Sequence, residues 1–103
     1  MEFTVEERLA LLNLLPPEGS LLTMKIVHEL RLALSFSDEE LEALQFQQNG
    51  DQLMWNQSVG PKEIQVGTKA MSIVYDKLAE FDKGGKLREI HLSLAEKFGY
   101  TGE

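Results

Sequence analysis

The sequence predicts an α+β fold of about five helices with a small antiparallel β-hairpin among them. Apolar residues recur at helical spacing in the first third of the chain and again in the last third. Between these stretches, Asn49-Gly50 separates two short segments of alternating polarity, which is typical of a hairpin. A length of 103 residues and a hydrophobic share of 43% suit one globular domain, 1–103. We therefore expect three N-terminal helices, a hairpin or three-stranded sheet, and a C-terminal helical hairpin.

The first two helices are separated by Pro16-Pro17. Thr4 and Glu7 have the spacing of a capping box, which predicts a helix from there to about Leu14. Ser20 or Thr23 is expected to cap the second helix. The expected buried positions are Val5, Leu9 and Leu12 in the first helix, with Leu11 as an alternative, and Leu22, Ile26, Val27, Leu30, Ala33 and Leu34 in the second.

A short third helix is predicted to begin after Ser37. Ser37 and Glu40 form a second capping box, and Phe36 and Leu41 have the spacing of a hydrophobic staple. Asp38 and Glu39 fall in the first turn, where the helix dipole favours negative charge.

The hairpin is predicted to turn at Asn49-Gly50, because a type I′ turn needs positive φ at both central residues. This register pairs Gln47 with Gln52 and Leu44 with Trp55. It places Leu44, Phe46, Leu53 and Trp55 on one face and Gln45, Gln47, Gln52 and Met54 on the other. Trp55, the single tryptophan, is then a core or half-buried residue; an exposed anchor for a partner is the alternative.

The C-terminal part is predicted to add one strand and two helices. Residues 63–66 alternate in polarity and are expected to form a third short strand. Thr68 is expected to cap the fourth helix, which ends at Gly84-Gly85. The fifth helix is expected from about Lys86 to Phe98, with Gly99 ending it.

The net charge of −7 lies wholly within residues 1–60, since residues 61–103 carry equal numbers of acids and bases. The densest acidic stretch runs from Asp38 to Glu42. An acidic chain without a basic stripe argues against direct binding to nucleic acid or to an anionic membrane. No apolar stretch approaches the length of a membrane span, and the acidic N-terminus lacks the basic region of a secretion signal. We expect a cytoplasmic protein.

No residue pattern predicts catalysis, a cofactor or a metal. Cysteine is absent, and His28 and His91 lack the spacing of a zinc site. Gly84-Gly85-Lys86 lacks the remaining residues of a phosphate-binding P-loop. Adjacent carboxylates at 38–42 point in different directions on a helix, unlike the paired acids of a hydrolase. We expect a protein that is not an enzyme.

Several segments of the chain share a pattern with known sequences. They are Arg8-Leu9 through Leu14-Leu15-Pro16-Pro17-Glu18-Gly19, 23–27, 34–40 and Glu63-Ile64-Gln65-Val66-Gly67, with Lys86-Leu87 and Glu96-Lys97-Phe98. With these segments the chain resembles a small uncharacterised single-domain protein family of tailed phages and prophages. This resemblance implies a phage context, hence the cytoplasm of a host cell, and assigns no role to any residue.

Two functions follow as hypotheses. The first is a non-enzymatic protein-binding module, a phage-type modulator or inhibitor of a host protein, whose acidic N-terminal half meets a basic partner surface. Its candidate contact residues are Asp38, Glu39, Glu40, Glu42, Gln47, Asn49 and Gln52. The acids would otherwise form only a capped, solvated helix start.

The second hypothesis is a structural protein that self-associates as a homo-oligomer. The first three helices contain more leucines than one helical stripe can bury, with Leu11, Leu21 and Leu32 in surplus. Surplus apolar surface in a short chain often marks an interface.

Overall fold

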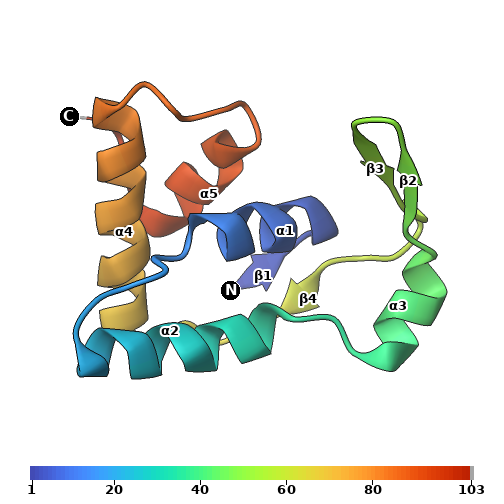
Figure 1. Cartoon of the computed structure of the whole chain (residues 1–103), viewed down its shortest axis with the longest axis horizontal. Coiled ribbons are helices and arrows are strands. Elements are labelled where there is room, and N and C mark those ends of the chain that lie inside the picture. The colour runs from blue at the N-terminus through green and yellow to red at the C-terminus, as the bar shows by residue number, and fades with distance from the viewer. Residues whose placement is uncertain (103) are drawn as a thin grey trace.

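The computed structural model describes residues 1–102 and confirms the α+β class. The helices are α1 (Val5–Leu14), α2 (Leu21–Leu34), α3 (Asp38–Leu44), α4 (Thr68–Lys83) and α5 (His91–Phe98). The strands are β1 (Glu2–Phe3), β2 (Gln47–Asn49), β3 (Gln52–Met54) and β4 (Lys62–Glu63). All of them are short, so helices dominate the fold (Figure 1).

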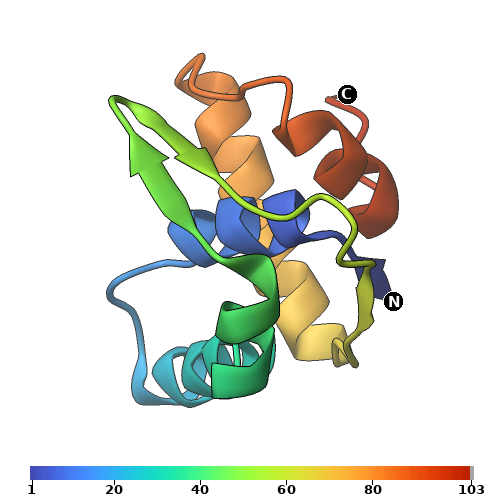
Figure 2. The ribbon, with the colours of Figure 1, turned by 90° about the vertical axis from the view of Figure 1, so that its right-hand side faces the viewer.

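Helices α1, α2, α4 and α5 form the body of the protein. α1 packs against α2, α4 and α5, and α4 also packs against α2 and α5 (Figures 1 and 2). Their shared core is apolar. Its fully buried side chains include Phe3, Leu11, Leu14, Leu34, Val74, Leu78 and Leu94. Burial of this continuous core supplies the main driving force for folding of the body.

The strands form two separate two-stranded antiparallel sheets rather than one three-stranded sheet. β2 pairs with β3 as expected, but β4 pairs with β1 at the N-terminus, not with the hairpin. The predicted strand at 63–66 is shortened to Lys62–Glu63, and β1 was not predicted. A strand of two residues is too short to show an alternation of polar and apolar side chains, and its partner lies 60 residues away. It therefore cannot be recognised from the sequence.

The hairpin turns one residue later than predicted. Asn49 pairs with Gln52, so the central turn residues are Gly50 and Asp51. Of these two turn residues, only Gly50 has a positive φ, +65°. This is typical of a type II′ turn, which needs glycine at its first central position. This later turn changes every residue pair of the hairpin, but Phe46, Leu53 and Trp55 still lie on one face. Leu44 is the last residue of α3 and is not part of a strand.

Most predicted helix ends are confirmed. Both capping boxes form, and Ser20 caps α2 through a bond from the Thr23 N–H. Gly67, not Thr68, precedes α4, and no side chain caps it. α5 begins at His91, five residues after the predicted start, because residues 86–88 are irregular and Glu89-Ile90 form a turn before the helix.

The buried faces of α1 and α2 differ in part from the prediction. Leu11 is fully buried and therefore not surplus, while Leu9 and Leu12 are only half-buried. Leu22 is exposed, since α2 packs through Val27, Leu30 and Leu34. Leu21 and Leu32 are exposed as expected, at 74% and 63%.

The α3 helix and the β2–β3 hairpin project from the body. We call residues 36–56 the arm; it stands at one end of the molecule, with the hairpin beside the N-terminal end of α1 (Figures 1 and 2). Within residues 1–102, the closely packed pairs of elements all lie inside the body or inside the hairpin. No helix of this described part is both long and apolar enough to cross a membrane.

Candidate functional site

The acidic helix of the arm owes its position to its capping box. The Ser37 Oγ accepts a bond from the Glu40 N–H at 3.2 Å, and the Glu40 carboxylate accepts from the Ser37 N–H at 3.1 Å. These bonds satisfy two of the free amides that every helix start leaves. Asp38, Glu39 and Glu42 are exposed on the outer surface of α3.

Glu40 points inward instead and joins the arm to the body. Its carboxylate lies 2.5 Å from Nη1 of Arg8 and 3.5 Å from Nζ of Lys62. Hydrogen bonding from Arg8, together with the nearby charges of Arg8 and Lys62, lowers the pKa of Glu40 to about 2, against the opposing effect of burial. Glu40 is thus engaged within the chain, unlike the three exposed acids.

Arg8 is the partner that sequence analysis missed. It is 2% exposed, and besides Glu40 it donates to the Leu34 carbonyl at 3.1 Å and to the Ser35 carbonyl at 2.7 Å. Its guanidinium also lies 4.0 Å from the centre of the Phe36 ring. Arg8 therefore links α1 to the end of α2 and to the start of the arm by charge, hydrogen bonds and stacking.

The arm has a small aromatic cluster of its own. Phe36 meets Phe46 edge-on at 5.4 Å, and Phe46 meets Trp55 edge-on at 6.0 Å. Leu44 is fully buried but lies outside the main core. Trp55 is half-buried, as predicted, and the three rings tie the base of the hairpin to Arg8.

The polar candidates lie together on the outer face of the hairpin. Gln47, Asn49 and Gln52 are all exposed, and their pairing puts them on the same face as Met54. At the foot of this face is a hollow of about 210 Å³ whose lining includes Gln45, Gln47, Met54 and Trp55. Gln45 is the residue at which α3 ends, and its backbone is left-handed, with φ of 50°. The hollow therefore lies at the junction between α3 and the hairpin.

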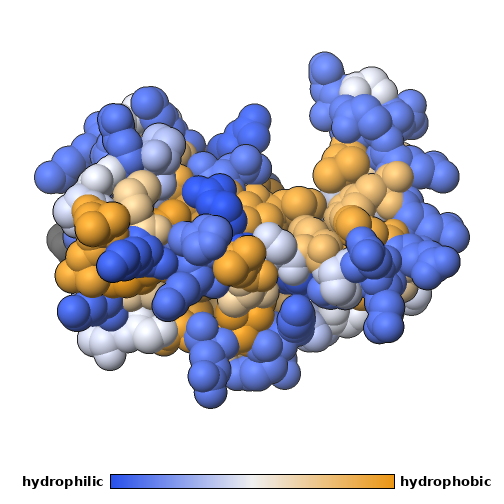
Figure 3. All heavy atoms as spheres, turned by 60° about the horizontal axis from the view of Figure 1, so that its bottom comes forward, coloured by the Kyte–Doolittle hydropathy of each residue, from blue (hydrophilic) through white to orange (hydrophobic). Residues whose placement is uncertain are grey.

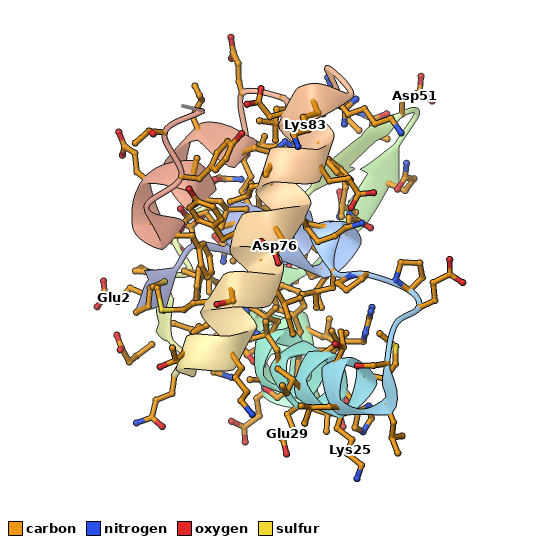
Figure 4. The ribbon with its side chains drawn as sticks, turned by 90° about the vertical axis from the view of Figure 1, so that its left-hand side faces the viewer. Glu2, Lys25, Glu29, Asp51, Asp76 and Lys83 are labelled. Carbon is orange, nitrogen blue, oxygen red and sulfur yellow. The ribbon has the colours of Figure 1, made fainter. Side chains whose placement is uncertain are left out.

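The distribution of charge sets the arm apart. Residues 36–61 contain five acids and no lysine, arginine or histidine. This stretch therefore holds five of the seven net negative charges, and Asp51 places one of them at the hairpin tip (Figure 4). The space-filling view shows the hairpin as a separate lobe with a hydrophilic tip and apolar side chains towards its base (Figure 3).

Three large apolar side chains of the arm, Leu41, Leu53 and Met54, are also exposed and were not among the candidates. Leu53 lies on the hairpin face that carries Phe46 and Trp55. Leu41 lies on α3, one turn before Gln45, and Met54 lies on the outer hairpin face. Leu41 was expected to staple the helix start and Met54 to face solvent beside the glutamines. The arm therefore offers acidic, amide and apolar groups on one projecting element.

Neither histidine contributes to the arm. His28 is exposed on α2, and His91 is buried at the start of α5. No group of three or more potential metal ligands occurs within the described residues 1–102.

No protein-family model, curated protein or solved structure matches this chain.

Proposed function

We propose that this protein is a non-enzymatic protein-binding module whose arm binds a partner with a basic surface. The supporting observation is the segregation of charge, since the arm has five acids and no base and projects from the body (Figure 1). A charge field of one sign accelerates the encounter with an oppositely charged partner and orients it.

The contact surface in this proposal combines three kinds of group. Asp38, Glu39 and Glu42 supply charge on α3, and Gln47, Asn49 and Gln52 supply hydrogen-bonding groups on the hairpin. Leu41 and Met54 add apolar area between them. Glu40 holds the arm in place through Arg8.

The biological setting is part of the same proposal. The resemblance to a tailed-phage family favours a protein that acts in the host cytoplasm as a modulator or inhibitor of a host protein. Occupying a basic surface would block whatever that surface otherwise binds.

A matched pair of triple variants tests the role of the arm. D38N/E39Q/E42Q removes three negative charges from the arm, and D76N/E89Q/E96Q removes three exposed charges from α4, α5 and the turn before α5. Each immobilised protein is exposed to host lysate at 50 mM and 500 mM salt, and captured proteins are quantified by mass spectrometry.

We expect the control triple to retain the partner captured by the wild type and the arm triple to lose it. Capture should also fall at the higher salt concentration, because exposed charges are screened over about 10 Å at 0.1 M. Equal capture by the arm triple, with a wild-type circular dichroism spectrum, would refute the proposal.

Self-association is the alternative function, and one observation favours it. Leu21 and Leu32 are strongly exposed, and their eleven-residue separation, about three turns, puts them on the same outer face of α2. Lys25 and Glu29 also point outward from this helix (Figure 4). Light scattering decides: a dimer that L21Q/L32Q makes monomeric supports this alternative, and a monomeric wild type at 100 μM removes it.

A further inference from the structure

A second hollow, remote from the arm, lies where α1, α4 and the turn before α5 meet. Its volume is about 230 Å³, and its apolar lining includes Leu14, Phe81 and Ile90. Its ionisable lining is basic: Lys86, Arg88 and His91 border it, and no aspartate or glutamate does. Asn13 also lines it, but the side-chain amide of Asn13 already donates to the Leu9 carbonyl at 3.1 Å. The nearest acids in sequence, Asp82 and Glu89, are exposed and do not line the hollow.

His91 is the informative residue in this hollow because it is only 7% exposed. Its Nδ1 accepts a hydrogen bond from the Arg88 backbone N–H at 2.9 Å. A neutral ring that accepts at Nδ1 carries its proton on Nε2, which makes Nε2 a donor. No protein group within residues 1–102 accepts from that nitrogen, and no fully buried side-chain nitrogen or oxygen there lacks a partner. Nε2 is therefore accessible from outside the protein.

The charges around the ring keep it neutral and leave the hollow positive. Burial and the positive charge of Arg88 lower the pKa of His91, so the imidazole donates from Nε2 without titrating at neutral pH. Lys86 and Arg88 contribute two full charges on the exposed side of the hollow. Three different donors thus border one small space.

We propose that this hollow binds a phosphate group, carried by a small organic molecule. The charges of Lys86 and Arg88 match the roughly two negative charges of a phosphate monoester, and its three terminal oxygens can accept from both cations and from Nε2 of His91. The apolar side chains of Leu14, Phe81 and Ile90 give the organic part a surface to pack on. This site is independent of the protein-binding proposal for the arm.

The two histidines provide an internal control for the test. NMR titration of the imidazole resonances reports the pKa of His91 in the hollow, and the resonances of His28, on the exposed surface of α2, report any non-specific effect of the anion. With inorganic phosphate as the first probe, we expect the pKa of His91 to rise, because a bound anion stabilises the charged ring, and the chemical shifts of His28 at fixed pH to stay unchanged. Sodium chloride at the same ionic strength should not reproduce the rise in the pKa of His91.

Two further probes define the ligand class. Phenyl phosphate should bind more tightly than inorganic phosphate, because its ring can pack on the apolar lining. Benzoate, which has the ring but a single-charged carboxylate, should bind more weakly than phenyl phosphate. Equal binding of benzoate and phenyl phosphate would overturn the choice of phosphate, and equal shifts of His91 and His28 would overturn the site.

Charge variants complete the design without disturbing the core. K86Q/R88Q should weaken phenyl phosphate binding by at least about tenfold, as expected for losing charge-assisted hydrogen bonds. K69Q/K83Q is the matched control, because it also removes two positive charges and both lysines are exposed on α4 without lining the hollow. Figure 4 shows Lys83 in the last turn of this helix. If K69Q/K83Q weakens binding as much as K86Q/R88Q, the effect is one of general charge and the site is refuted.

Discussion

The body and the arm are held together in different ways. The body surrounds one continuous apolar core to which β1 and all four body helices contribute. The arm has only Leu44 and three half-buried aromatic rings, which reach the body through Arg8 and Glu40. Charge is divided in the same way, since the stretch from Phe36 to Pro61 holds most of the net charge.

This difference explains why the arm can be so acidic. A buried charge is costly unless it is paired, so acids that are neither paired nor needed for folding must lie where packing is sparse. A two-stranded hairpin is at best marginally stable alone and needs an anchor. Arg8 supplies that anchor from inside the body, which leaves the outer surface of the arm free to be polar and charged.

Replacing Arg8 should have the largest effect on the stability of the protein, because Arg8 is the main polar link between the body and the arm. Arg8→Met would leave two carbonyl oxygens without their donor and Glu40 with only the more distant Lys62. Because Glu40 is partly exposed, we expect a loss of about 3 kcal/mol, the lower end of the cost of breaking a fully buried ion pair. Urea unfolding should show this loss, while hydrogen exchange should accelerate in the arm.

The matched control is Arg31→Met, which removes an exposed arginine from α2 and should change the unfolding free energy by less than about 0.5 kcal/mol. If R8M is as stable as R31M, the arm does not depend on Arg8, and the contrast between the regions is wrong.

Acid should weaken the same link reversibly. The pKa of Glu40 falls from the ordinary 4.5 to about 2 in the folded protein, so its stabilisation is complete above pH 4.5 and is lost as the pH drops towards 2. This difference in the pKa of Glu40 corresponds to about 3 kcal/mol of stabilisation of the folded protein. Unfolding free energies measured between pH 6 and pH 2 should therefore decline less in E40Q than in the wild type. E39Q, which makes the same charge change on an exposed neighbour, should keep the wild-type decline.

The smallest effect concerns the hairpin tip. Gly50 has φ of +65° and open space around it, so Gly50→Ala should cost about 1 kcal/mol through backbone strain alone. Gly60 has equally open surroundings but no positive φ, so Gly60→Ala should be neutral or slightly stabilising. Chemical denaturation separates the two, and an equal response at both positions would show that the tip has little influence on arm stability.

Local signals in the sequence were reliable because they depend on residues three or four apart. The Thr4–Glu7 and Ser37–Glu40 boxes and the Gly99 stop each satisfy nearby backbone groups, whatever the rest of the fold does. The hairpin was also found, although its turn is displaced by one residue because Asn49-Gly50 and Gly50-Asp51 are both suitable turn pairs.

The remaining features depend on distant contacts. Arg8 would be read as a surface residue of α1, and only its approach to Glu40, 32 positions away, explains its burial. The same approach separates Glu40 from the acids beside it, which no pattern along the chain distinguishes. The late start of α5 likewise reflects the bond between His91 and the Arg88 amide, not helix propensity.

Tryptophan and tyrosine are divided between the two regions, so each region has its own spectroscopic signal. Trp55, the single tryptophan, belongs to the arm cluster, whereas Tyr75 and Tyr100, the two tyrosines, face each other edge-on at 5.2 Å in the body. Tryptophan emission, excited where tyrosine does not absorb, therefore follows the arm, and the tyrosine ring resonances in NMR spectra follow the body in one unlabelled sample. Coincident melting curves would mark the protein as a single cooperative unit, and an earlier tryptophan transition would identify the arm as a unit that opens on its own.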